Sequence, residues 1–285
     1  MVPQLFYQLY TIHANKSEYL FACVYILLTN KTKETYKKAF SILKEKRLDL
    51  QPKTITTDFE KPVMDALKYI FPNLELQRCF FHLSRAIWRK IQSIRLTNSY
   101  VTDTNSRLDC KLLAALAFLD PDDITKAFEE LLDTLQDLQM EQEMEELYCY
   151  FEDTYIGRPQ RTGGRRKPPL FSPMMWSVAQ RSTDGLPRTT NKIEGWNRAI
   201  QTLYDSPHPS LWRFLRGIQK EETMQRNKLT SYLLGERETT SKKAKEINGR
   251  IQTLKQRLQN EEMSTFEFPR GITYLIKYRL NINFK

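Results

Sequence analysis

Two strand-length apolar segments near the start of the chain constrain its fold most. Residues 5–13 (LFYQLYTIH) and 19–29 (YLFACVYILLT) are rich in aromatic and β-branched side chains, and a short polar segment separates them. This pattern predicts a β-hairpin. Neither segment reaches the roughly 18 apolar residues that a membrane-spanning helix needs, so we expect no membrane partner.

The following residues alternate between helix and strand patterns. A stripe of Tyr36, Phe40 and Leu43 predicts a helix that precedes a short strand at 54–57. A second helix begins at Pro62 and stops before Pro72. A strand pattern at 74–81 then leads into an amphipathic stretch at 83–94, and the chain is mainly helical from about residue 105. This order predicts an α/β fold and is typical of most of a ribonuclease H-like core.

Charge is unevenly distributed along the sequence. The 285 residues carry a formal net charge of +10, although residues 120–153 contain thirteen acids and one base. The segment 157–169 (GRPQRTGGRRKPP) predicts a basic loop. This distribution favours a polyanion such as nucleic acid as the partner, and a merely solvated basic protein is the alternative. The predicted DNA contacts are Arg158, Arg161, Arg165, Arg166, Lys167 and Arg198.

Two acids occupy positions suited to hold a metal ion. Asp58 ends the predicted strand at 54–57 just before a helix, and Glu60 in the same loop is a weaker candidate. Glu194 lies early in a later helix, on one face with Arg198. The alternatives are that Asp58 caps the helix that follows it and that Glu194 is an exposed acid paired with Arg198.

Cys79 and His82 (RCFFH) have the spacing of metal ligands. A structural zinc needs four ligands, and no second Cys or His pair lies nearby in the sequence. One interpretation is a zinc ion at Cys79 and His82, and the other is a buried cysteine beside a hydrogen-bonded histidine. The four cysteines are scattered, form no disulfide framework and favour a reducing intracellular compartment.

Three segments together resemble the transposases of Mutator-like elements (MULEs). They are FYQLYTIH, TITTDFEKPVMDALKYIFPNLELQRCFFHLSRAIWRKIQ and LPRTTNKIEGWNRAIQTL, and they follow one another in the order found in that family. The resemblance implies the DDE/DDD superfamily, a ribonuclease H-like fold, DNA as partner and Mg²⁺ or Mn²⁺ as cofactor. It places the second catalytic Asp of the family at Asp58, its third acid at Glu194 and its CxxH motif at Cys79 and His82.

The same resemblance implies a division of the chain into four parts. The first part of the core covers 1–95, a helical insertion with the basic loop covers 96–190, and a core helix with the third acid covers 191–222. A C-terminal helical region covers 223–285. The family's first catalytic Asp lies in a DGTF-like strand, which this sequence does not contain. We therefore expect an N-terminally truncated relative that lacks the central first strand of the core and is not a competent transposase.

Two functions are consistent with these expectations. The lineage is that of an enzyme that cuts and rejoins DNA with metal-held carboxylates. The alternative is a domesticated or decayed transposase that binds DNA or chromatin without cleavage, in the nucleus, where the patch GRRKPP is suited to import. A homo-oligomer is a further expected assembly. A third interpretation is a helical interaction protein built on 120–153 and 242–263, which predicts no affinity for DNA.

Overall fold

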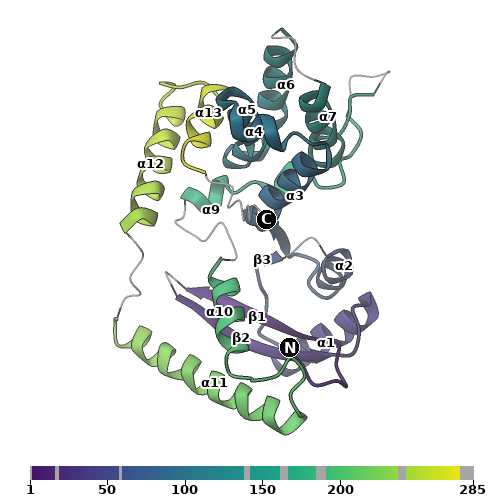
Figure 1. The fold of residues 1–285 in the computed structure, drawn as a ribbon. Helices are drawn as coiled ribbons and strands as arrows, with labels where there is room; N and C mark the ends of the chain where they lie inside the picture. The colour runs from purple at the N-terminus through teal and green to yellow at the C-terminus, as the bar shows by residue number, and fades with distance from the viewer. Residues whose placement is uncertain are drawn as a thin grey trace. The chain divides into compact units, whose positions relative to one another are not determined.

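The computed structural model describes residues 2–16, 19–57, 60–137, 142–160, 166–183, 191–236 and 242–276 (Figure 1). The chain forms two compact units. Unit 1 comprises Met1–Leu76 and Thr189–Thr240, and unit 2 comprises Gln77–Arg188 and Ser241–Lys285. Each unit therefore combines segments that are distant in the sequence.

Unit 1 is built around the predicted hairpin. Strands β1 (Gln8–Lys16) and β2 (Tyr19–Leu28) pair antiparallel, and the register shifts by one residue between Ile12 and His13. This pairing confirms the hairpin, although β1 continues past residue 13 to Lys16. The side chains of this extension, residues 14–16, are exposed, so its polar groups stay in contact with water. Pairing with β2 satisfies the backbone hydrogen-bonding groups of the extension without burying polar side chains.

Helix α1 (Lys33–Lys46) covers one face of the hairpin. The ring of Tyr10 on β1 lies 5.5 Å from that of Tyr36 and 5.8 Å from that of Phe40, both buried on α1. The Thr32 side chain accepts a hydrogen bond from the Thr35 N–H and so caps the helix. Helix α2 (Lys61–Ile70) packs beside α1 and has a proline in its first turn, as the sequence predicts.

Helices α10 (Asn191–Gln201) and α11 (Leu211–Leu233) belong to the other face of the hairpin (Figure 1). Ile200 and Phe214 form a buried cluster against which Leu9 and Leu27 of the two strands pack. Neighbouring residues of a strand point to opposite faces, so Leu9 packs against this cluster while Tyr10 packs against α1. The hairpin is thus covered on both sides.

Strands β3 (Thr54–Thr57) and β4 (Glu75–Arg78) form a second two-stranded sheet. The predicted strand at 54–57 is confirmed. The strand predicted at 74–81 ends earlier, because Phe80 and Phe81 already form the first turn of α3 (Phe80–Ser93). The described residues form a mixed α/β structure with two separate two-stranded sheets. They do not show the continuous sheet of a ribonuclease H-like core.

Unit 2 is largely helical, and helices α3, α7 (Gln142–Phe151) and α13 (Glu267–Thr273) pack against α5 (Thr104–Ala115). Its core includes the stacked rings of Phe128 and Phe151, with Trp176 edge-on to Phe151. None of the described helices is both long and apolar enough to cross a membrane. The remaining helices are α4 (Thr97–Thr102), α6 (Pro121–Asp137), α8 (Pro173–Trp176), α9 (Ala179–Thr183) and α12 (Lys242–Gln259), with a π-helical turn at Glu152–Ile156.

Candidate functional site

The predicted metal-site residue Asp58 follows β3 directly and lies outside the described residues. Glu60, two positions later, occupies the N-cap position of α2, but its side chain forms no capping hydrogen bond. Its carboxylate accepts a 3.2 Å hydrogen bond from the Tyr36 hydroxyl, which accepts a 2.6 Å hydrogen bond from the Gln8 amide. Burial of Tyr36 raises its pKa to about 12. Glu60 is therefore engaged in a hydrogen-bonded chain that links β1, α1 and the start of α2.

The second predicted metal-site residue, Glu194, is half-buried in the first turn of α10. Arg198, one turn later, is exposed. The described part of the chain contains no ion pair between these two side chains. Glu194 thus stands on a helix that is fixed by other contacts, chiefly those of Trp196.

Trp196 anchors α10 to the rest of unit 1 through a buried carboxylate. Its indole N–H donates a 2.5 Å hydrogen bond to Glu221 on α11, a side chain that is only 4% exposed. The Gln225 amide donates a second hydrogen bond of 2.7 Å to the same carboxylate oxygen. Gln225 in turn accepts a 3.1 Å hydrogen bond from the backbone N–H of Ala22. This network ties α10, α11 and β2 together.

Two further polar rings complete the surroundings of Trp196. The His13 ring lies edge-on at 4.7 Å from the Trp196 ring, and the Tyr25 ring lies at 6.1 Å. Burial lowers the pKa of His13 to about 4. Burial, and to a lesser degree the charge of Glu221, raises the pKa of Tyr25. Both rings are therefore uncharged at neutral pH.

This network is absent from the sequence-based expectations. Trp196 is recognisable beforehand as part of a helical stripe, but its partners lie on other elements. A local signal exists at Glu221, because it shares the buried face of α11 with Phe214 and Gly217. An acid on such a face needs a hydrogen-bond donor from a neighbouring element.

The predicted pair Cys79 and His82 lies at the start of α3. Cys79 is fully buried, and its backbone carbonyl accepts hydrogen bonds from the N–H groups of His82 (3.1 Å) and Leu83 (3.3 Å). The His82 ring lies edge-on to Phe81 at 5.5 Å. Across the described ranges, no group of three or more His, Cys, Asp or Glu side chains is placed to hold a metal ion. The described surroundings of Cys79 and His82 therefore do not complete a zinc site.

The basic loop starts from a tightly closed base. Pro159 and Arg166 form an antiparallel bridge, and the Lys167 N–H donates a 2.8 Å hydrogen bond to the Arg158 carbonyl. Gly157 adopts a φ of +89°, and a Cβ at this position would lie 1.9 Å from the Lys167 carbonyl oxygen. The predicted DNA contacts Arg161 and Arg165 lie outside the described residues.

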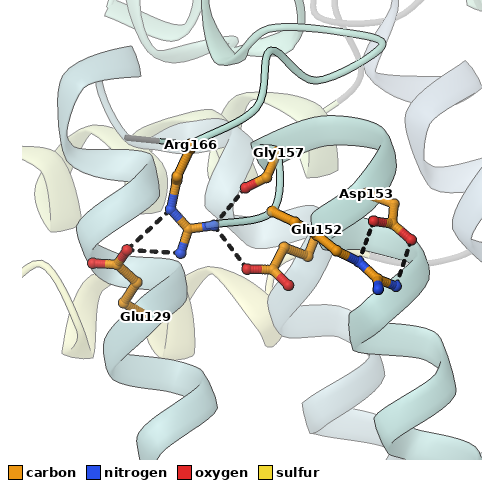
Figure 2. Close-up of polar contacts among 6 residues, drawn as sticks. Glu129, Glu152, Asp153, Gly157 and Arg166 are labelled. Carbon is orange, nitrogen blue, oxygen red and sulfur yellow. Dashed lines mark hydrogen bonds and ion pairs between the residues drawn. The ribbon is translucent and has the colours of Figure 1, made fainter. Parts of the chain in front are cut away.

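Two arginines of this loop are neutralised within the protein. Figure 2 shows Arg166 between two acids: it donates 2.7 Å hydrogen bonds to Glu129 and Glu152. Arg158 donates a 2.7 Å hydrogen bond to Asp153, with which it forms an ion pair. The acidic segment 120–153 thus balances part of the charge of the basic loop. Lys167 is exposed and forms no ion pair with a described acid.

Unit 1 exposes further cations that the sequence alone does not single out. Arg213, Arg216 and Lys220 share one face of α11 at spacings of three and four residues. Arg213 forms an ion pair with Asp205. Arg216 and Lys220, like Arg198 on α10, are exposed and have no ion pair among the described residues.

A comparison with known families identifies the first part of the chain. The family model of the MULE transposase domain matches residues 3–86, which include Asp58, Cys79 and His82 but not Glu194. No curated protein and no solved structure matches the chain. The match confirms the resemblance over residues 3–86 and does not extend to the third motif, LPRTTNKIEGWNRAIQTL. Residues 3–86 of this chain are therefore similar to the MULE transposase domain.

Proposed function

We propose that this chain is a transposase-derived protein that binds DNA and does not cleave it alone. The match of residues 3–86 to the MULE transposase domain carries this proposal. The exposed cations of unit 1 support it, because phosphate contacts provide most of the affinity of a protein for DNA. The proposal includes a ribonuclease H-like ancestry for the core around β1–β4.

Asp58 and Glu194 are, in this proposal, the inherited positions of the family's second and third acids. The family implies a divalent metal ion, which carboxylates would hold. Metal-assisted phosphoryl transfer needs several carboxylates that converge on the ions. The resemblance supplies two of the three, Asp58 and Glu194, and Asp58 lies outside the described residues. We therefore derive no catalytic step and propose binding as the activity.

The DNA contacts are assigned to cations that have no ion pair among the described residues. In unit 1 these are Arg198, with Arg216 and Lys220 on α11 added to it, and in unit 2 Lys167 is a separate contact. Arg158 and Arg166 are weaker contacts, because DNA would have to replace their ion pairs with Asp153, Glu129 and Glu152. Arg161 and Arg165 stay in the proposal on sequence grounds.

The test is a titration of fluorescent duplex DNA by the full chain at several salt concentrations. Binding that releases counterions gives a log–log salt slope of about −0.9 for each phosphate contact. Arg198→Ala, Arg216→Ala and Lys220→Ala are each expected to reduce the magnitude of that slope by about one contact and to weaken binding on all sequences alike.

Arg47→Ala is the matched control. Arg47 is an exposed arginine in unit 1, but it already forms an ion pair with Asp49 at 2.9 Å, so its loss should leave the salt slope unchanged. Absence of DNA binding at physiological salt would refute the proposal and favour the helical interaction protein. Equal effects of all four variants would show that the contacts lie elsewhere.

A nuclear location is part of the same proposal. The patch GRRKPP includes Arg166, which is engaged by Glu129 and Glu152, so import would depend on Arg165 and Lys167. Exclusion of a fluorescent fusion of the chain from the nucleus would contradict this assignment.

A further inference from the structure

Helix α11 exposes large apolar side chains along an outer face that lies beside its buried face. Phe214 is buried on the inner face, where α11 contacts β2. On the outer face, Trp212 is 74% exposed and Leu233 is 73% exposed, and Leu215 and Leu229 are exposed as well. Large apolar side chains gathered on one exposed face favour association with another surface.

These side chains belong to one regular stripe along the whole helix. Steps of three and four residues alternate along it without interruption. The outer stripe consists of Trp212, Leu215, Gln219, Glu222, Arg226, Leu229 and Leu233. This spacing is the seven-residue repeat through which two helices pack side by side. The stripe is apolar at both ends and carries one acid and one base at its centre.

We propose that the outer stripe binds the outer stripe of a second copy of this chain, with the two helices antiparallel. A parallel pair would place every residue opposite its own copy. Glu222 would then face Glu222 and Arg226 would face Arg226, and like charges in contact disfavour association. An antiparallel pair brings opposite charges together around a two-fold axis.

One antiparallel register matches the stripe from Leu215 to Leu233 and leaves Trp212 beyond the paired stretch. With Glu222 opposite the partner's Arg226, Leu215 lies opposite the partner's Leu233, and Gln219 lies opposite the partner's Leu229. A shift by one repeat would place Leu215 opposite the partner's Arg226 and lose the charge match. Within each chain Glu222 already forms an ion pair with Arg226, so the dimer centre holds two acids and two bases in alternation.

The size of this contact indicates a reversible dimer. The paired stretch runs from Leu215 to Leu233 and spans about 28 Å at 1.5 Å per residue. A single helix pair of this length buries less surface than a standard stable interface. We therefore expect a weak, reversible dimer rather than a permanent one.

The test is sedimentation equilibrium of the full chain over a range of concentrations, with charge-reversal variants. The mass of the natural chain should rise from 33.9 kDa toward twice that value. Glu222→Arg places four positive charges at the dimer centre and Arg226→Glu places four negative ones, so each should weaken association about tenfold or more. The double variant restores two opposite-charge pairs and should dimerise again.

Lys38→Glu is the matched control, because it reverses an exposed charge of unit 1 on α1, outside the outer stripe. It should dimerise like the natural chain, and circular dichroism should show all variants folded. A natural chain that stays monomeric at millimolar concentration overturns the proposal. So do single variants that dimerise normally, which would indicate another surface, and a double variant that stays monomeric. Single reversals that alter only DNA binding would identify DNA as the occupant and likewise overturn it.

Discussion

Glu221 is a buried carboxylate whose two hydrogen-bond donors come from different positions of unit 1. Trp196 and Gln225 both donate to it, and Trp196 is the residue that fixes α10. Glu221→Ala leaves both donors without their acceptor in a buried place. We expect it to lower the free energy of unfolding by about 1–3 kcal/mol, measured by urea denaturation.

Glu222→Ala is the neighbouring control for this prediction. Glu222 is partly exposed and forms an i,i+4 ion pair with Arg226, which contributes only about 0.3–0.5 kcal/mol. Both variants are to be measured at a concentration well below that of self-association. Equal losses of stability in the two variants would show that the buried network does not hold α10.

His13 gives unit 1 a defined dependence on pH. Its folded-state pKa of about 4 lies below the ordinary value of 6.5, so the unfolded chain binds a proton more readily between these values. The contribution of neutral His13 to stability is therefore present above pH 6.5 and is lost as the pH falls through about 4. His13→Gln should flatten the stability curve in this window by about 1–2 kcal/mol, after allowance for partial solvent screening.

Urea denaturation at several pH values between about 4 and 7 checks this prediction. Other groups titrate in the same window, so the informative quantity is the difference between the natural chain and the variant. Curves that run parallel for the two proteins would show that His13 does not contribute.

At the scale of elements, Gly157 is decisive for the base of the basic loop. Its φ of +89° disfavours other residues, and a Cβ there would meet the Lys167 carbonyl oxygen at 1.9 Å. Gly157→Ala should therefore destabilise unit 2 by more than the roughly 1–2 kcal/mol of backbone strain alone, measured by thermal or urea unfolding.

Gly235→Ala separates the two causes. Gly235 has a φ of +85°, but a Cβ there would have no neighbouring atom within 4 Å. This variant should cost only the backbone strain. If Gly157→Ala cost no more than Gly235→Ala, the close approach to Lys167 would not matter for stability.

The elements show what local sequence patterns predict and what they do not. The strand at 54–57 and the helix that begins at Asn191 follow from local apolar spacing and flanking residues. The strand predicted at 74–81 is too long, because alternation of apolar residues does not reveal that Phe80 begins a helix. Arg166 appears free in the sequence, since its partners Glu129 and Glu152 reach it only through the tertiary fold.

At the scale of the whole molecule, the sequence predicts the family that residues 3–86 match. It does not predict the hydrogen-bonded network around Trp196 or the outer stripe of α11. The motif around Asp58 and Cys79 is local, and the match at residues 3–86 confirms the family that it indicates. The Trp196 network and the outer stripe of α11 depend on which helix faces contact the hairpin. Those faces are set by packing between segments distant in the chain, which a single sequence does not specify.

The central claim is that this chain binds DNA without cutting it. The most direct measurement incubates purified residues 1–285 with fluorescent supercoiled and linear duplex DNA in Mg²⁺ or Mn²⁺, and records bound fraction and strand breaks in the same samples. The account predicts salt-sensitive binding with intact strands. Metal-dependent strand breaks that are lost in Asp58→Asn and Glu194→Gln would contradict it, because two inherited acids would then suffice for cleavage.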